Sequence, residues 1–278
     1  MIILDGKKIK NEILDELKNK VNNLEDKPHL TVIQVGDNEA SNVYIKQKAK
    51  MAEYVGYGYK HLKLPEDITE EALLSEIDRL NNDATVHGIL VQMPLPRHID
   101  TNKIQNAVLP EKDIDGLSDI NAGKLFHDND GLFACTPYGI MELLKRYNIF
   151  VEGKHAVIVG RSNLVGKPLS VMLTHAGATV TLCHSKTKDL AKYTKMADIL
   201  IVAVGHPKLI TSDMISDNVI VIDVGINRLE DRLVGDVDFD NICNRCSYIT
   251  PVPGGVGPMT VAMLGENILK AYKMQKEK

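Results

Sequence analysis

The sequence predicts an α/β protein of two lobes with a cleft between them, one lobe being a doubly wound nucleotide-binding domain. Three observations lead to this prediction. Expected strands alternate with expected helices in both halves of the chain, as they do around parallel sheets. A glycine-bearing turn directly follows the first strand of the second half, at Gly160. The length of 278 residues is comfortable for two domains and long for one.

The first half carries helical and strand patterns in alternation. The helix expected first places Ile9, Ile13 and Leu17 on one face. Glycine and proline then punctuate the chain at the ends of the expected strands. In order, we expect a helix over Lys7–Leu24, a strand over Leu30–Val35, a helix over Glu39–Tyr54, a helix over Thr69–Leu80 and a strand over Val86–Gln92.

The second half has the cleaner pattern of a Rossmann-like domain. A polar, turn-rich zone over Asp100–Gly131 precedes it and receives no assignment. The expected elements are a bridging helix over Pro137–Tyr147, a strand over His155–Val159, a helix over Gly166–Ala176, a strand over Thr179–Cys183, a helix over Lys188–Met196, strands over Ile199–Val204 and Val219–Val224, and a last helix over Pro258–Tyr272.

Composition and charge exclude several classes of protein. Hydrophobic residues make up 44% and charged residues 25% of the chain, which is close to the average for globular proteins. A disordered, collagen-like or membrane-embedded chain is therefore not expected. The 33 basic residues stand against 37 acidic residues, which gives a net charge of −4. A chain with this balance is not held to nucleic acid by its overall charge.

The cellular setting is expected to be the reducing cytoplasm. No targeting signal is visible at the start, and apolar stretches such as Ile199–Val204 have the length of strands and not of membrane spans. Four cysteines in a chain of this size do not resemble a disulfide framework. Cys243-x-x-Cys246 is half of a zinc site without a second pair, so we expect no metal.

The turn Gly160–Pro168 is the expected site of a nucleotide. Its glycines let backbone amides meet a pyrophosphate at the start of a helix. The stretch from Gly153 to Lys188 holds no acidic residue, although an NAD site usually places an acid near the end of the second strand. Arg161, Ser185 and Lys186 suit the 2′-phosphate of NADP instead. A turn without a ligand and a solvated basic face are the plainer alternatives.

A stripe on the second expected helix is the candidate for proton transfer. At about 100° per residue, Ser41, Tyr44 and Lys48 fall on one side, beside the apolar line of that helix. A lysine that loses solvation at the edge of a buried face can exchange a proton near neutral pH. The alternative is a lysine that only extends its ammonium group into solvent. A Tyr-x-x-x-Lys pair also occurs in short-chain dehydrogenases, but there it follows the nucleotide turn.

Several motifs together resemble the bifunctional methylenetetrahydrofolate dehydrogenase/cyclohydrolase family. The match covers nearly the whole chain in the order of the family, and its last motif is the most specific. The motifs are Ser41-x-x-Tyr44-x-x-x-Lys48, Val91-Gln92-Met93-Pro94-Leu95-Pro96, Pro110-Glu111-Lys112-Asp113-Ile114-Asp115-Gly116, Gly160-Arg161-Ser162-x-x-Val165-Gly166-x-Pro168 and Thr250-Pro251-Val252-Pro253-Gly254-Gly255-Val256-Gly257-Pro258-Met259-Thr260.

The resemblance implies a function in one-carbon metabolism, which feeds purine biosynthesis. The family oxidises 5,10-methylenetetrahydrofolate to the methenyl compound with NADP, and then hydrolyses that cation to 10-formyltetrahydrofolate. The resemblance also implies a homodimer. Three alternatives stay open: a cyclohydrolase with weak or absent dehydrogenase activity, a two-domain NADP dehydrogenase for another small substrate in the manner of shikimate-type enzymes, and a binding module without catalysis.

The same resemblance implies the roles of single residues. Lys48 matches the catalytic lysine, and Gln92 matches the glutamine that hydrogen-bonds it. Tyr44 matches the ring that stacks on the aminobenzoyl part of folate, and Asp115 matches the pterin anchor. The loop of Pro253, Gly254 and Gly255 would close over the substrate. The cofactor contacts implied are Gly160, Arg161, Ser162, Ser185, Ile226 and Thr136.

The domain boundaries follow from this assignment of roles. We expect residues 1–120 and 262–278 to form the folate-binding catalytic domain, because these ranges hold the lysine stripe and a returning last helix. Residues 121–261 are expected to form the Rossmann-like NADP-binding domain.

Overall fold

The structure is a computed structural model that describes residues 1–230 and 232–277. The chain divides into two compact units. The six-stranded unit comprises Met1–Lys10 and Thr136–Thr260. The three-stranded unit comprises Asn11–Cys135 and Val261–Lys278. The α/β architecture of two domains is thereby confirmed, whereas the boundaries expected near residues 120 and 261 stay a prediction.

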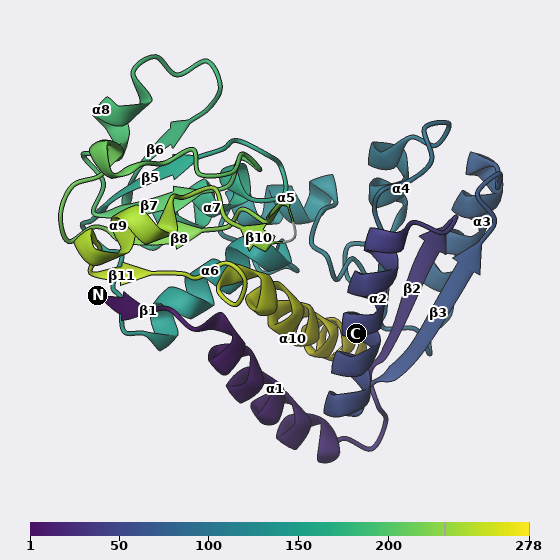
Figure 1. The fold of residues 1–278 in the computed structure, drawn as a ribbon. Coiled ribbons are helices and arrows are strands. Elements are labelled where there is room, and N and C mark those ends of the chain that lie inside the picture. The colour runs from purple at the N-terminus through teal and green to yellow at the C-terminus, as the bar shows by residue number, and fades with distance from the viewer. Residues whose placement is uncertain (231, 278) are drawn as a thin grey trace. The chain divides into compact units, whose positions relative to one another are not determined.

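The six-stranded unit is built on one parallel sheet of the described chain, with the strand order β1-β11-β8-β7-β5-β6. Figure 1 shows these strands one below the other, from β6 down to β1 near the N-terminus. In chain order the strands are β1 (Ile2–Ile3), β5 (His155–Val159), β6 (Thr179–Cys183), β7 (Ile199–Val202), β8 (Ile220–Asp223) and β11 (Tyr248–Ile249).

The order of these strands creates a topological switch point. The chain passes from β5 to β6 on one side and then crosses to β7 on the other side of β5. In open α/β sheets, ligands bind outside the carboxyl ends of the strands at this point. The strands β7 and β8 are buried along their whole length, which explains why β7 is entirely apolar and β8 is apolar up to its last residue, Asp223.

Helices and one hairpin complete the six-stranded unit. The helix α7 packs on β5 and β6. The hairpin follows β8, and its two strands are antiparallel. The elements are α6 (Cys135–Arg146), α7 (Gly166–His175), α8 (Leu190–Thr194), η1 (Ser212–Met214), β9 (Asn227–Leu229), β10 (Arg232–Val234), α9 (Phe239–Ile242) and η2 (Cys243–Arg245).

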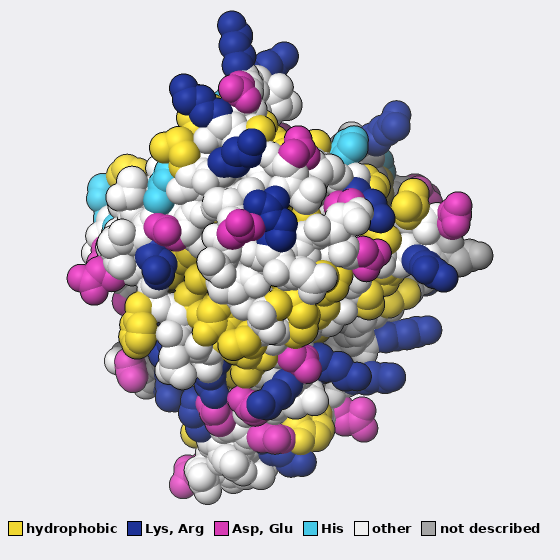
Figure 2. Space-filling view, turned by 60° about the vertical axis from the view of Figure 1, so that its left-hand side comes forward, with side chains coloured by type: hydrophobic (Ala, Val, Ile, Leu, Met, Phe, Trp, Pro, Cys, Tyr) yellow, Lys and Arg dark blue, Asp and Glu magenta, His cyan; other side chains and the backbone are white. Residues whose placement is uncertain are grey.

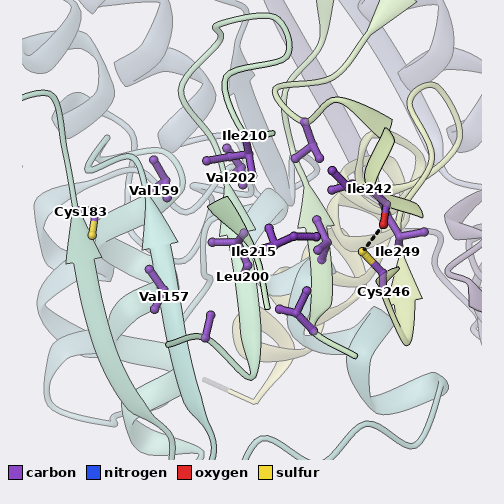
Figure 3. Packing of buried hydrophobic residues seen from close by; sticks show 14 residues of the cluster. Val157, Val159, Cys183, Leu200, Val202, Ile210, Ile215, Ile242, Cys246 and Ile249 are labelled. Atoms are coloured by element: carbon purple, nitrogen blue, oxygen red, sulfur yellow. Dashed lines mark hydrogen bonds between the residues drawn. The ribbon is translucent and has the colours of Figure 1, made fainter. Parts of the chain in front are cut away.

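One core cluster of this unit lies against one face of the sheet (Figure 3). Branched aliphatic side chains from β5, β7 and β8 pack together there, among them Val157 and Leu200. Cys246 is 3% exposed in the same cluster, and its thiol donates to the carbonyl of Ile242 at 3.3 Å. Its burial raises the pKa of the Cys246 thiol to about 11. Cys246 therefore acts as a core residue.

The three-stranded unit contains, among its described residues, a parallel sheet of order β3-β2-β4. Figure 1 shows β2 and β3 side by side, as their pairing requires. Its elements are β2 (His29–Val35), α2 (Glu39–Val55), β3 (Gly58–Leu64), α3 (Glu70–Asn81), β4 (Gly88–Val91), α4 (Thr101–Ala107) and α5 (Asp119–Phe126). The long helices α1 (Gly6–Asn22) and α10 (Val256–Lys276) each contribute residues to both units.

Several elements differ from the sequence prediction, which did not include the short strands β1, β9, β10 and β11 or the helix α9. The strand β3 was not expected, because it is an edge strand that carries lysines and no regular apolar alternation. The zone over Asp100–Gly131 contains two short helices, which begin after the capping side chains of Asp100 and Ser118. The helix expected over Lys188–Met196 is shorter and spans Leu190–Thr194. None of the helices formed by the described residues is long and apolar enough to cross a membrane.

Candidate active site

The helix α2 carries the predicted lysine stripe in the three-stranded unit. The side chain of Asn38 accepts a hydrogen bond from the backbone N–H of Ser41, and this cap fixes where the helix starts. The helix ends at Gly56, whose φ of 90° suits glycine. Tyr44 is 47% exposed, and Lys48 is half-buried one turn further along. An exposed ring beside a half-buried amine is a surface that can take a flat aromatic ligand.

Gln92 brings an amide to Lys48 from the end of β4. The Nζ atom of Lys48 donates to Oε1 of Gln92 at 2.8 Å, and the glutamine is 9% exposed. Its backbone N–H donates to the carbonyl of Ile33 on the neighbouring strand at 2.8 Å. The predicted partnership of Lys48 and Gln92 is therefore present in the fold, although their roles in a reaction stay a prediction.

The amide of Gln92 is held in one orientation by the carbonyl of Met93. This carbonyl accepts from Nε2 of Gln92 at 2.8 Å and from Oγ of Ser41 at 3.1 Å. Because Nε2 must face an acceptor, Oε1 is left to face the lysine. Ser41 is 2% exposed and contributes to this arrangement from the start of α2.

Asp115 lies in a loop that several buried groups hold rigidly. The ammonium group of Lys112 donates to the carbonyls of Leu80, Asn81 and Asp83, at 3.0, 2.8 and 2.8 Å. The carboxylate of Asp113 accepts from the backbone N–H groups of Gly116 and Ser118 and from Nδ2 of Asn121, at 3.1, 2.9 and 3.0 Å. The two residues that precede Asp115 by two and three positions thus belong to the scaffold.

The side chain of Asn267 on α10 also holds this loop, which was not predicted from the sequence. Its Nδ2 atom donates to the carbonyls of Ile114 and Phe133, at 2.8 and 2.9 Å. Asn267 is 1% exposed. The signal in the sequence is an asparagine among the apolar residues of the last helix, because a polar residue on a buried face needs hydrogen-bond partners.

The electrostatics of Asp115 are set by its surroundings. Burial raises the pKa of its carboxyl group, the ammonium group of Lys48 acts in the opposite direction, and the Asp113 carboxylate adds to the rise. The charge of Lys48 therefore acts on the carboxyl group of Asp115. The three-stranded unit thus presents an amine, an amide and a carboxylate that can hold a proton, orient it and accept N–H groups of a ligand.

The predicted nucleotide turn lies at the carboxyl end of β5 in the six-stranded unit. A Cβ atom on Gly160 would lie 2.2 Å from the carbonyl oxygen of Ala203, and its φ is 123°. A Cβ atom on Gly166 would lie 1.8 Å from the carbonyl oxygen of Gly160. Both positions therefore require glycine. Arg161 and Ser162 are exposed in the turn, and α7 begins after Val165 without a side-chain cap.

Basic side chains gather near the carboxyl end of β6. Ser185 and Lys186 are exposed in the turn that follows this strand, where the Lys186 N–H donates to Nδ1 of His184 at 3.1 Å. Figure 2 shows lysine and arginine side chains at the top of the molecule, where Figure 1 places α8 and the loop before it. Exposed cations with the uncapped N-terminus of α7 fit a dinucleotide that carries an extra phosphate.

The remaining predicted residues also lie in the six-stranded unit. Ile226 is 51% exposed after β8, and Oγ1 of Thr136 lies 3.0 Å from Oγ1 of Thr260. The loop of Pro253, Gly254 and Gly255 is fixed by the start of α1, because the N–H of Lys7 donates to the carbonyl of Gly254 at 3.0 Å. The predicted contact of this loop with folate stays a prediction. No group of three metal-ligating side chains occurs in the part of the chain that the structure describes.

The sequence models of two protein-family domains match the chain. "Tetrahydrofolate dehydrogenase/cyclohydrolase, catalytic domain" matches residues 4–115, and "Tetrahydrofolate dehydrogenase/cyclohydrolase, NAD(P)-binding domain" matches residues 134–276. A protein of Nautilia profundicola named bifunctional protein FolD is 55% identical over 278 residues, which cover 98% of this chain and 98% of that protein.

Solved structures agree with this match. The bifunctional enzyme FolD, a methylenetetrahydrofolate dehydrogenase/cyclohydrolase from Campylobacter jejuni, superposes with a TM-score of 0.97 at 52% identity and covers 99% of each chain. The N5,N10-methylenetetrahydrofolate dehydrogenase-cyclohydrolase of Trypanosoma brucei, which was solved with NADP cofactor and inhibitor, gives a TM-score of 0.95 at 37% identity. It covers 100% of this chain and 99% of that one.

Proposed function

The chain belongs to the tetrahydrofolate dehydrogenase/cyclohydrolase family, and on this premise we propose that Lys48, Gln92, Tyr44 and Asp115 carry its folate chemistry. The protein oxidises 5,10-methylenetetrahydrofolate to 5,10-methenyltetrahydrofolate with NADP, and hydrolyses the methenyl cation to 10-formyltetrahydrofolate. The observation that carries the assignment of residues is the 2.8 Å hydrogen bond between Lys48 and Gln92.

The folate is held by two side chains in this proposal. The carboxylate of Asp115 accepts two hydrogen bonds from the 2-amino-pyrimidinone edge of the pterin. The loop around Asp115 is braced by Asn267 and Asp113, so the carboxylate needs little reorganisation when the substrate arrives. The exposed ring of Tyr44 stacks on the aminobenzoyl group.

The proton in the hydrolysis is handled by Lys48. Lys48 acts as a base only when it is deprotonated; Nζ then donates one N–H to Oε1 of Gln92 and keeps a lone pair that points away from the amide. That lone pair takes a proton from the water that attacks the methenyl carbon, which leaves a hydroxyl group on this carbon. The hydroxyl group then loses its proton to form the formyl C=O on N10, while the C–N5 bond breaks and N5 takes up a proton. An uncharged amide suits this role because a carboxylate at the same place would stabilise the ammonium form.

The six-stranded unit binds the cofactor. When bound there, NADP would supply the acceptor for the hydride that leaves the methylene carbon. Gly160 allows the backbone to approach the pyrophosphate at the start of α7, while Arg161, Ser162 and Ser185 offer donors to its phosphates. Ile226 and Thr136 complete the proposed contacts, and the loop of Pro253, Gly254 and Gly255 closes over the substrate.

One assay tests the two activities separately. Purified protein is mixed with methylenetetrahydrofolate and either NADP or NAD, and reduced cofactor is followed in the near ultraviolet. The methenyl substrate alone reports the hydrolase. If neither nucleotide is reduced, the dehydrogenase assignment is contradicted. If the methenyl substrate is hydrolysed no faster than in the uncatalysed reaction, the hydrolase assignment is contradicted.

The variant Lys48→Met tests the role of the lysine. It should abolish hydrolysis while the protein keeps its thermal unfolding midpoint. Lys46→Met is the matched control, because Lys46 lies exposed on the same helix. Hydrolysis by Lys48→Met at the rate of the Lys46→Met control would refute the proposed role.

We further propose that the protein is a homodimer in the cytoplasm, as the resemblance to the family implies. Light scattering coupled to size-exclusion chromatography should give twice the mass of the 30.8 kDa chain. Cell fractionation should recover the dehydrogenase activity in the cytoplasmic fraction.

A further inference from the structure

Two buried carboxylates in the six-stranded unit have no place in the function proposed above. Asp223 is the last residue of β8 and is 3% exposed, and Asp236 follows the hairpin strand β10 and is 0% exposed. Each accepts three N–H hydrogen bonds. Burial raises the pKa of Asp223 to about 6, against the effect of its backbone donors. Charges that are costly to bury point to a task that an apolar side chain could not perform.

Asp236 holds the turn that follows β7. Its Oδ2 atom accepts from the backbone N–H groups of Val204 and Gly205, at 2.7 and 3.0 Å. Its Oδ1 atom accepts from Nδ2 of Asn227 at 2.9 Å. Both peptide N–H groups of this turn are thereby drawn toward the inside of the unit, and the path of the chain after β7 is fixed.

Asp223 holds the turn that follows β8 and joins it to Asp236. Its Oδ1 atom accepts from the N–H groups of Gly225 and Asp236, at 3.0 and 2.9 Å, and Oδ2 accepts from Val237 at 3.0 Å. A Cβ atom on Gly225 would lie 2.2 Å from Oδ1 of Asp236. The two carboxylates and this glycine thus form one close-packed unit, which we call the aspartate clasp (Asp223, Gly225 and Asp236).

The clasp holds the turns on one side of the topological switch point. The switch point lies between β5 and β7, and β6 lies on the other side of β5 (Figure 1). Ser185 follows the end of β6 by two positions. The carbonyl of Ala203, directly before the clasped turn, is the atom that leaves no room for a side chain at Gly160. A dinucleotide that crosses at Gly160 places its adenosine half toward β6 and its other half toward β7 and β8.

We propose that Asp223 and Asp236 are positioning residues for the nicotinamide half of NADP, acting through the turns at Val204–Gly205 and Gly225–Ile226. This inference rests on the proposed function, because it takes NADP as the ligand. Neither aspartate touches the cofactor in this proposal. They hold two backbone turns in the conformation that binds the nicotinamide half. Binding therefore does not pay the entropy of ordering these turns.

The test compares the whole cofactor with its adenosine half. Isothermal titration measures binding of NADP and of 2′,5′-ADP, which carries the 2′-phosphate and lacks the nicotinamide. In Asp236→Ala the dissociation constant of NADP should rise about tenfold or more, whereas that of 2′,5′-ADP should change less than about twofold. Asp236→Asn keeps one acceptor oxygen and should fall between wild type and Asp236→Ala.

A matched control lies at the opposite, amino-terminal ends of the strands of the same sheet. Asp198 also accepts a backbone hydrogen bond, from the N–H of His155 at 2.8 Å, at the amino ends of the strands. Asp198→Asn should bind both ligands as the wild type does. Where Asp236→Ala does not fold, Asn227→Ala removes one hydrogen-bond donor to Asp236 and should still raise the dissociation constant for NADP selectively.

The outcomes separate the inference from the function on which it rests. Unchanged NADP binding in Asp236→Asn and Asn227→Ala, or equal weakening of both ligands, would overturn the positioning role while wild-type activity remains intact. Loss of NADP binding by the wild type would overturn the proposed function and the inference together. The hydrolysis rate of Asp236→Asn without cofactor should stay at the wild-type value, and a parallel loss would indicate general damage and refute the proposal.

Discussion

The Nζ atom of Lys48 lies 2.8 Å from Oε1 of Gln92, and the same amide donates through Nε2 to the carbonyl of Met93 at 2.8 Å. The amide is therefore held at both ends. Because it cannot rotate without losing its bond to Met93, it offers the lysine an uncharged acceptor and nothing else. A change of the charge at position 92 is therefore the most direct test of how this amide affects Lys48.

The variant Gln92→Glu should move the pH profile of hydrolysis. A carboxylate at this distance stabilises the ammonium form, so the rising limb of the profile should shift to higher pH by about 1–3 units. Initial rates of methenyl hydrolysis across the pH range measure the shift. Gln92→Met removes the hydrogen bond without adding charge and should lower the rate without that shift. An identical profile for Gln92→Glu and wild type would contradict the proposed role of the amide.

The variant Asp115→Asn should gain stability at neutral pH and lose folate binding. Burial raises the pKa of this carboxyl group above its ordinary value of 3.8, so the folded state holds the proton more tightly than the unfolded chain. The stability of the wild type therefore falls as the pH rises through the folded pKa and stays lower above it. Asparagine does not ionise, so the stability of the variant does not fall in this way as the pH rises.

Two measurements check Asp115→Asn. Its unfolding temperature should exceed that of the wild type by a few degrees at pH 8, about 2–4 °C per kcal/mol, and by less at pH 4. Its affinity for folate should fall about 10–100-fold, because a charged hydrogen-bond acceptor is lost. A lower unfolding temperature at pH 8 would show that the attraction to Lys48 outweighs the cost of burial.

The variant Gly6→Ala should destabilise the loop of Pro253, Gly254 and Gly255. A Cβ atom at position 6 would lie 1.8 Å from the carbonyl oxygen of Gly255, so the loop must move. We expect a loss of about 1–3 kcal/mol in the free energy of unfolding and a raised KM for folate. Gly123→Ala is the control, because its Cβ would meet nothing within 4 Å and alanine favours α5. Equal free energies of unfolding and equal KM values for folate in the two variants would argue against the close contact between Gly6 and Gly255.

The variant Ser185→Asp should shift the cofactor preference from NADP toward NAD. An acid at the end of β6 repels a 2′-phosphate and provides the acceptor that an NAD ribose uses. The KM for NADP should rise about 10–100-fold, while the KM for NAD should fall. Thr179→Asp places the same charge at the exposed opposite end of β6 and should leave both values unchanged. A preserved preference for NADP in Ser185→Asp would place the phosphate elsewhere.

The sequence predicted those features that are local or that repeat along the chain. The strands β5 and β7 were expected because buried parallel strands are uninterrupted apolar runs. The turn at Gly160 and the basic stretch around Lys186 were expected because both lie within one βαβ unit. The edge strand β3 escaped prediction, because its pairing with β2 decides its conformation and its own residues do not.

What the sequence alone determined is the family, the α/β class and the identity of the chemical groups, since motifs and periodicity are written in neighbouring residues. Only the tertiary structure decided what those groups face. The orientation of the Gln92 amide depends on the carbonyl of Met93, and the loop of Asp115 depends on Asn267, more than 150 positions along the chain. The pairing of Asp223 with Asp236 depends in the same way on how β8 and the hairpin pack. Hydrogen bonds between distant segments follow from the packing of the chain, and no pattern of neighbouring residues encodes them.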